Sequence, residues 1–401
     1  MKIFYLFLFS ILPVFSESIY DCIDSKNLNC LIGVLEKNPR SKDQISPDGY
    51  SPLQKTVLSE WVPGMKQILS VKPNLNYQSK TEKGTAVLFA ALKGKNEIIS
   101  PILEAGADPN IISNHDFLPF ASAVEKNCSN DTLELFEKYK ANLNPKKGET
   151  PLGAAIKKKD WKCTEKLLDK GADIKLVPAA FHHAIADRNK DMVKLFLQKG
   201  ANPNLPGRIN NAFFMALMSK NQGIIDELMD SAKPDLKVQD EGETLLHSAL
   251  KTGNEKFADY FVENSPLPTG KTKVTKETLL HFAAKGGNLK YCKFFLEKGL
   301  NVNEGDFEGS TPFLILASSG PKDLNTEVIE EFLKYKPNLD IAYKDTKQTA
   351  MHYFMNKKNK KAVKLLLQNG ANPDLRDNNG QTVRAFYTKE RDSDILELMK
   401  R

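Results

Sequence analysis

Cysteine and histidine are the side chains of this sequence that could bind a metal ion or act as a nucleophile with its base. The chain has five cysteines and six histidines, but no cluster of them has the spacing of a zinc site. Cys292 with His281 would supply a thiol and a base, yet both fall at positions expected in a protein core, and no oxyanion donor is indicated. We therefore predict no catalytic residue, no metal site and no cofactor.

Four of the histidines occupy one position of a recurring phrase of the type Thr-Pro-Leu-His. An imidazole at the start of a helix can hydrogen-bond to the Thr that caps this helix and to a neighbouring turn. We therefore interpret these histidines as structural, with a metal-ligand role as the alternative. The other two, His115 and His183, have no Cys or His partner at zinc spacing. The four histidines in register are His182, His247, His281 and His352.

Five glycines recur as well, but they belong to predicted turns and not to a phosphate-binding loop. Glycine adopts positive φ at no steric cost, which is a sufficient reason for its presence in a tight turn. These glycines are Gly84, Gly148, Gly242, Gly309 and Gly380.

The phrase returns about every 33 residues, with separations of 34, 33, 32, 29, 32, 33, 34, 33, 38 and 33. A fixed period of this size is typical of a stacked repeat protein, in which each unit buries its apolar face only against its neighbours. We therefore predict one elongated domain rather than several compact ones. The copies begin at Ser51, Thr85, Leu118, Thr150, Ala179, Asn211, Thr244, Thr278, Thr311, Thr349 and Thr382.

Each copy predicts a helix, a turn and a second helix. The hydroxyl of Thr278 can cap a first helix, in which Ala283-Ala284 allow a second helix to approach closely. A proline after the Thr, as in Thr150-Pro151, is preset for helical entry. Leu365 to Leu367 contribute to the apolar stripe of a second helix, which Gly370 ends in the left-handed conformation.

These motifs resemble the ankyrin repeat, whose consensus is T-P-L-H-x-A-A, a turn, a second helix that ends in L-L, and G-A-D/N-x-N leading into a hairpin finger. Glu149 to Leu152 with Gly171 to Asp173 carry the match, as do Leu103 to Asn110 and Leu366 to Pro373. The resemblance covers Pro47 to Arg401 in about eleven units, the last of them a C-terminal cap. It implies an all-α repeat solenoid of helix-turn-helix units with projecting fingers.

The first sixteen residues differ in kind from the repeats. Lys2, an apolar run from Ile3 to Leu12 and a small residue at Ser16 are typical of a signal peptide. The run is short for a bilayer span, and an uncleaved anchor is the alternative. We therefore expect an exported protein, periplasmic, cell-surface or secreted, and the Lys- and Asn-rich composition favours a bacterial source. Residues 17–46, with a helical pair from Ser18 to Lys37, would cap the start of the repeats.

Export would place the cysteines in a compartment where disulfides persist. Cys22 and Cys30 lie eight residues apart across a predicted helical turn, so a bridge between them would fasten the N-terminal pair. Cys128 and Cys163 lie in neighbouring units and form a second candidate pair. Cys292 is expected to remain a buried free thiol.

The resemblance implies binding through the concave face of the first helices and through the fingers. A net charge of +7 is too modest for nucleic acid, which needs a denser basic stripe. We predict a protein partner, possibly acidic because the concave row is mostly lysine. An enzyme or metal protein on the same scaffold, or an assembly factor that self-associates, is the alternative. The candidate binding residues are Lys93, Lys126, Lys157, Lys251, Lys271, Lys273, Lys285, Arg208, Phe307 and Tyr343.

Three irregular copies are the places where the protein's particular function should be sought. The finger Thr269 to Lys276 replaces the usual Gly-Ala-Asp turn, and its lysines should project together. The segment Ser318 to Asn325 lengthens one unit by five residues and should bulge outward. Lys175 to Pro178 stands in for a full hairpin and should shorten one finger.

Overall fold

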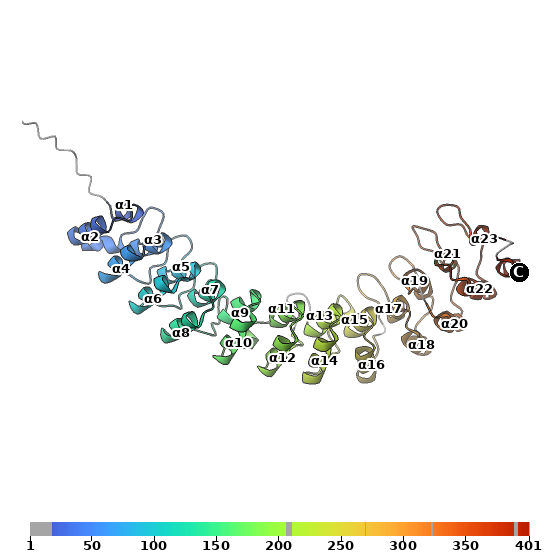
Figure 1. Ribbon diagram of the computed structural model, residues 1–401. Coiled ribbons are helices and arrows are strands. Elements are labelled where there is room, and N and C mark those ends of the chain that lie inside the picture. Colours follow the sequence, from blue (N-terminus) through green and yellow to red (C-terminus); the bar gives the residue numbers. More distant parts are fainter. Residues whose placement is uncertain (1–17, 206–210, 269, 322–323, 389–391, 401) are drawn as a thin grey trace, which may run out of the picture. The chain divides into compact units, whose positions relative to one another are not determined.

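The computed structural model describes residues 18–205, 211–268, 270–321, 324–388 and 392–400. The predicted leader lies outside these residues. The chain divides into two compact units, Met1–Asn202 and Pro203–Arg401, each built from short helices in pairs. After α2, the first helix of each pair has an odd number and the second an even number (Figure 1).

In Met1–Asn202 the elements are α1 (Ile19–Asp24), α2 (Leu28–Lys37), the 3-10 helix η1 (Pro39–Asp43), α3 (Pro52–Leu58), α4 (Val62–Ser70), α5 (Ala86–Lys93), α6 (Asn96–Glu104), α7 (Pro119–Lys126), α8 (Asn130–Lys138), α9 (Pro151–Lys157), α10 (Trp161–Asp169), the 3-10 helix η2 (Ile174–Leu176), α11 (Ala180–Ala186) and α12 (Lys190–Gln198).

In Pro203–Arg401 they are α13 (Ala212–Ser219), α14 (Gln222–Ser231), β1 (Gln239–Asp240), β2 (Glu243–Thr244), α15 (Leu245–Thr252), α16 (Glu255–Asn264), α17 (Leu279–Gly286), α18 (Leu289–Glu297), α19 (Pro312–Ser319), α20 (Thr326–Lys334), α21 (Ala350–Asn356), α22 (Lys360–Gln368), α23 (Val383–Phe386) and α24 (Ser393–Leu398). The strands β1 and β2 pair antiparallel, with Gln239 opposite Thr244.

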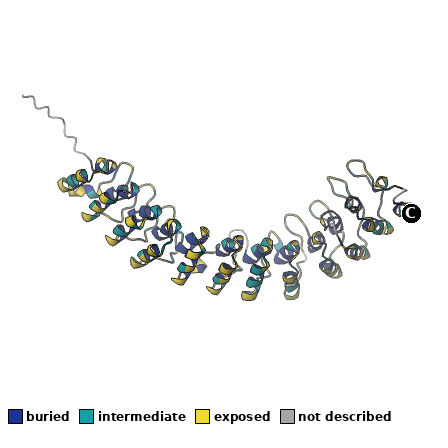
Figure 2. Ribbon diagram, viewed as in Figure 1, coloured by how far each residue is buried: buried dark blue, intermediate teal, exposed yellow. Residues whose placement is uncertain are grey.

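Within each unit the helices form two layers. First helices pack against first helices, as α5 does on α7 and α17 on α19, and second helices pack against second helices, as α18 does on α20. The phenylalanines Phe136, Phe282 and Phe332 are buried between the layers. Figure 2 shows buried residues where helices face one another and exposed residues on the outer faces of the second helices. This architecture confirms the predicted all-α repeat solenoid.

The helix ends have the expected capping chemistry. The hydroxyl of Thr150 accepts a hydrogen bond from the amide of Gly153 at 2.9 Å, and Pro151 opens α9. Gly370 follows α22 with a φ of 85°, as predicted for a left-handed helix end. Gly84 differs from its register partners because its φ is not positive. A side chain there would lie 2.6 Å from the ring of Phe89, so close approach requires this glycine.

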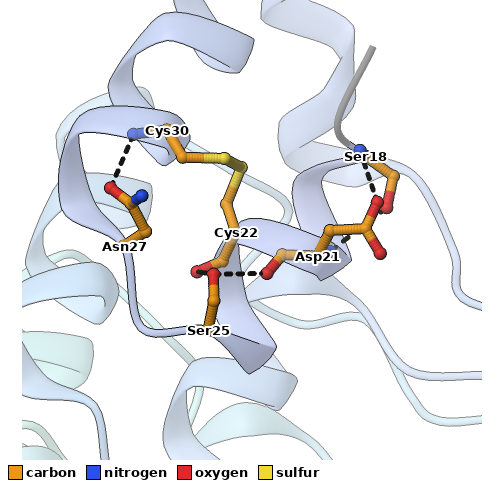
Figure 3. Close-up of a disulfide and its surroundings, with 6 residues drawn as sticks. All are labelled: Ser18, Asp21, Cys22, Ser25, Asn27 and Cys30. Carbon is orange, nitrogen blue, oxygen red and sulfur yellow. Dashed lines mark hydrogen bonds between the residues drawn. A yellow bond between two sulfur atoms is a disulfide. The ribbon is translucent and has the colours of Figure 1, made fainter. Parts of the chain in front are cut away.

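Both predicted disulfides are present. Cys22 on α1 and Cys30 on α2 are bridged with their Cα atoms 5.4 Å apart (Figure 3). Ser18 and Asp21 form a capping box at the start of α1, and the side chain of Asn27 accepts a hydrogen bond from the amide of Cys30 at 3.1 Å (Figure 3). These caps stabilise the first turn of each of the two bridged helices.

The second disulfide joins Cys128, in the turn between α7 and α8, to Cys163 on α10, with a Cα separation of 6.0 Å. It links two successive repeats. Cys292 is a buried free thiol, as predicted, and burial raises its pKa to about 12.

Of the two copies with irregular length, the shortened one has a clear structural counterpart, whereas part of the lengthened segment lies outside the described residues. In place of a hairpin, the short finger contains the single turn η2. Ala179 is the N-cap residue of α11 and provides no side-chain cap. In the lengthened copy, residues 322–323 lie outside the described part, and the side chain of Leu324 is buried. Among the described helices, none has the length and apolar character that crossing a membrane requires.

Candidate interaction surface

The register histidines form ties within and between repeats. In α17, His281 Nδ1 accepts a hydrogen bond from the amide of Thr278 at 3.1 Å and lies 2.9 Å from its hydroxyl. Its Nε2 lies 3.1 Å from the carbonyl oxygen of Ser310, at the foot of the next finger. His352 makes the same contacts with Thr349 and, at 3.4 Å, with the carbonyl of Gln381. The structural interpretation of these two residues is confirmed.

Two other histidines in register complete only part of this pattern. His247 contacts Thr244 through Nδ1, but its buried Nε2 has no hydrogen-bond partner in the described residues. Burial lowers the pKa of His247 to about 4 although the Glu277 carboxylate opposes this shift. In the copy that contains His182, the capping position is occupied by Ala179, which has no hydroxyl. The Nδ1 atom of His182 is likewise buried without a hydrogen-bond partner in the described residues.

The sequence predicts a row of lysines on the concave face of the first helices, here called the basic row. Several of these lysines are neutralised by neighbouring carboxylates. Lys93 Nζ lies 3.1 Å from Glu60, and Lys157 Nζ lies 3.6 Å from Glu149. Lys285 forms an ion pair with Glu277. The remaining candidates of the row, Lys126 and Lys251, are exposed and have no ion pair in the part of the chain that the structure describes.

In the irregular finger that ends at Lys276, the lysines do not all project together as the sequence predicts. Lys271 forms an ion pair with Glu304 and donates to the carbonyl of Gly305 at 2.9 Å, so it fastens its own finger to the next one. The Lys271 ammonium lowers the pKa of Glu304. Lys273 is exposed, and its amide donates to the carbonyl of Glu241 on the preceding finger at 2.8 Å. Neighbouring fingers therefore engage the side chain of Lys271 and the backbone of Lys273, while the side chain of Lys273 remains exposed.

A hollow of about 570 Å³ lies in Pro203–Arg401, where three successive fingers meet the first helices α17 and α19. It brings together three sequence candidates, Lys285, Phe307 and Tyr343. Lys271 and Lys273 stand on one of these fingers but do not line it. Arg208 lies outside the described residues. The hollow is lined by Val274, Thr275, Glu277, Lys285, Asp306, Phe307, Glu308, Ile315, Ser319 and Tyr343.

Exposed apolar side chains stand at the rim of this hollow. Val274 is 61% exposed and Phe307 is 73% exposed, although both are large apolar residues. The amide of Phe307 donates to the carbonyl of Thr275 at 2.9 Å, which holds the two finger tips side by side. The backbone is therefore fixed while the two side chains remain available.

Deeper in the hollow the polar groups are partnered. Glu277 keeps only 6% of its side chain exposed and is paired with Lys285, whose ammonium lies 5.7 Å from the ring centre of Phe282. The Tyr343 hydroxyl lies 2.9 Å from the hydroxyl of Ser318, and burial raises the pKa of Tyr343.

Sequence reasoning missed Glu277, Asp306, Glu308 and Ile315, and it included Val274 only as a member of the irregular finger. Val274 offered a signal, since an apolar residue within a Lys- and Thr-rich finger has no core to enter. Ile315 belongs to the apolar face of α19 and is 4% exposed, so its sequence position indicates only a core residue. In the described residues, no group of three or more His, Cys, Asp or Glu side chains could hold a metal ion.

Comparison with known proteins finds repeat families along most of the chain. A family model described as ankyrin repeats (3 copies) matches residues 118–207, 181–271 and 314–399, and a second, described as ankyrin repeat, matches residues 275–304. Among solved structures, the ankyrin repeat domain of Bcl-3, described as a unique member of the IkappaB protein family, is 16% identical. It aligns with a TM-score of 0.38 over 55% of this chain and 97% of that chain.

Proposed function

This chain belongs to the ankyrin-repeat family, and from that premise we propose that it is a non-enzymatic scaffold that binds another protein through its first helices and fingers. The observation that carries the proposal is the hollow beside Val274 and Phe307. Exposed apolar and aromatic side chains that gather at one place are typical of protein interfaces. The hydrogen bond between the two fingers fixes the backbone that carries these side chains before a partner binds, and this lowers the entropic cost of binding.

The same proposal includes export of the protein, with cleavage after Ser16. The two disulfides support it, because disulfides persist in oxidising compartments and are rare in the cytosol. Intact mass of the protein from its native compartment tests this point. The expected chain begins at Glu17 and is shorter by sixteen residues, whereas a full-length mass in a soluble fraction would contradict cleavage.

The partner is proposed to present acidic groups to Lys251, which lies in the same unit as the hollow and has no ion pair among the described residues. Surface charge pairs weaken as salt screens them. Binding of the captured partner should therefore weaken when the salt concentration rises from about 0.05 to 0.5 M, and Lys251→Glu should weaken it further. Equal affinity at both salt concentrations would contradict the proposal that the partner is acidic, but not the proposal that the chain is a binding scaffold.

Photo-crosslinking from the hollow tests the scaffold itself. A photoreactive benzoylphenylalanine in place of Phe307 should give a specific covalent adduct in the native compartment. The matched control places the same group at Tyr335, the C-cap residue that follows α20 in the second-helix layer and is 38% exposed. Equal adducts from both positions, or none from Phe307, would contradict the proposal. An adduct with twice the mass of the chain would indicate the alternative function, self-association.

A further inference from the structure

The charge of the hollow is opposite to that of the whole chain. Three carboxylates, from Glu277, Asp306 and Glu308, line it together with a single ammonium group, that of Lys285. The chain as a whole carries a formal net charge of +7. The basic row therefore gives no guide to the ligand at this place.

The three carboxylates are not equivalent. Lys285 neutralises Glu277. Asp306 accepts hydrogen bonds from the amides of Glu308 and Ser310, at 2.9 and 2.8 Å, so it shapes the turn of its finger, and it has no ion pair among the described residues. Glu308 is exposed and has no ion pair in the described part of the chain. The rim thus carries uncompensated negative charge beside Phe307.

The other groups of the hollow suit a cation on a long apolar stem. Val274 and Ile315 offer aliphatic contact, while Phe307 and Tyr343 offer aromatic rings. Cations bind to the faces of aromatic rings, and a guanidinium also stacks on them and pairs with carboxylates in a fixed planar geometry. A lysine ammonium shares only the point charge. Lys344, on the next finger, does not line the hollow, but its Cε would lie 3.7 Å from a Cβ built on Gly309.

We propose that this hollow binds an arginine side chain of the partner protein, with the methylene stem against Val274 and Ile315 and the guanidinium between Phe307 and the carboxylate of Glu308. The inference rests on the proposed function, because it names the group by which the bound protein is held. The hollow has a volume of about 570 Å³, which lies within the range of ~300–1,000 Å³ that is typical of ligand pockets.

The test uses the full chain with labelled Ile and Val methyl groups, and Ile315 and Val274 as reporters. The probe is N-acetyl-arginine methylamide, and the matched control is the citrulline derivative, which has the same shape without the charge. Arginine should shift both reporter signals saturably and bind about tenfold more tightly than citrulline, because only the guanidinium makes a charge-assisted contact. An N-acetyl-glutamate probe should leave the reporters unchanged.

Two variants locate the contact, and both change exposed side chains so that the fold is preserved. Glu308→Gln should weaken the arginine probe at least about threefold, and Phe307→Ala should abolish the saturable shift. Glu263→Gln, on the exposed face of α16, should have no effect. Lys344→Gln should tighten binding, because it removes a nearby positive charge.

Equal binding of citrulline, a response to the glutamate probe, or full binding by Glu308→Gln would overturn the inference. These outcomes are separate from those of the crosslinking experiment. A protein adduct at position 307 without any response to the arginine probe would support the binding scaffold and contradict the arginine site. A saturable response to the arginine probe without any adduct would support an arginine-binding hollow and contradict the binding scaffold.

Discussion

The side-chain amide of Gln54 donates a hydrogen bond to the carbonyl oxygen of Gly84 at 2.8 Å, which ties one repeat to the next. Gln54 is the fourth residue of its phrase, the position that His281 occupies in a later copy. The side-chain oxygen Oε1 of Gln54 also accepts a hydrogen bond from the backbone amide of Ser51 at 2.9 Å. In the same way, His281 Nδ1 accepts a hydrogen bond from the amide of Thr278. The tie therefore needs a donor and an acceptor at fixed positions and not an imidazole as such.

Replacement of His281 tests this equivalence. His281→Gln should retain most of the stability, whereas His281→Ala should lower the unfolding free energy by about 1–3 kcal/mol, because it leaves the carbonyl of Ser310 without its partner. Urea unfolding followed by circular dichroism measures both. His115→Ala, in an exposed finger, is the control and should change little. A Gln variant as unstable as the Ala variant would show that the imidazole is specifically required.

His247 should make stability depend on pH. Its pKa falls from 6.5 to about 4 on folding because the ring is buried. The unfolded chain therefore binds a proton below about pH 6.5 that the folded chain takes up only near pH 4. The stabilisation is fully present above pH 6.5 and is lost as the pH falls toward 4, with an upper limit of about 3 kcal/mol.

The matched variant for this effect is His247→Gln, which cannot titrate and can make the capping contact that Gln54 makes. Urea midpoints measured from pH 4 to 7 should rise less steeply with pH in the variant than in the natural chain. Burial also lowers the pKa of His281, so some slope with the same sign should remain. Identical slopes in both proteins would show that His247 is not the titrating group.

The two disulfides should stabilise the protein to different extents. The Cys128–Cys163 bridge closes a loop of 35 residues and the Cys22–Cys30 bridge one of 8. A longer loop loses more entropy in the unfolded chain, so removal of the longer bridge should cost about 1 kcal/mol more. Melting of the two double Cys→Ala variants measures this difference. Mass spectrometry of the non-reduced protein should find one free thiol, and five free thiols would exclude both bridges.

Cys292 should be inert toward thiol reagents in the folded protein. Its side chain is fully buried and its pKa is raised to about 12, so almost no thiolate is available near neutral pH. Reaction with a thiol-specific chromogenic reagent should be slow without denaturant and complete in seconds when the chain is unfolded. The Cys292→Ser variant gives the background rate. Rapid labelling of the folded chain would mean that this repeat opens readily.

Spacing and residue type were enough to predict the repeat architecture, and they indicated the two cysteine pairs as candidates that the structure then showed to be bridged. The Thr-Pro-Leu-His register, the paired alanines and the left-handed Gly370 act over a few residues, and local capping and periodicity therefore settle them. The register places Cys128 and Cys163 in neighbouring repeats. Cys22 and Cys30 precede the first copy of the phrase, and their separation of eight residues across the turn of one helical pair indicates that they can meet.

Only the tertiary structure decided which surface groups remain available. Lys271 and Lys285 look like free cations in the sequence, but their partners Glu304 and Glu277 come from another finger or from before the helix, and pairing depends on how side chains meet after stacking. Ile315 has an ordinary core position in its helix, yet it lines a hollow because neighbouring fingers leave space above it. The sequence determined the repeat and its internal ties, which are local, whereas contacts between successive fingers created the acidic hollow beside Phe307.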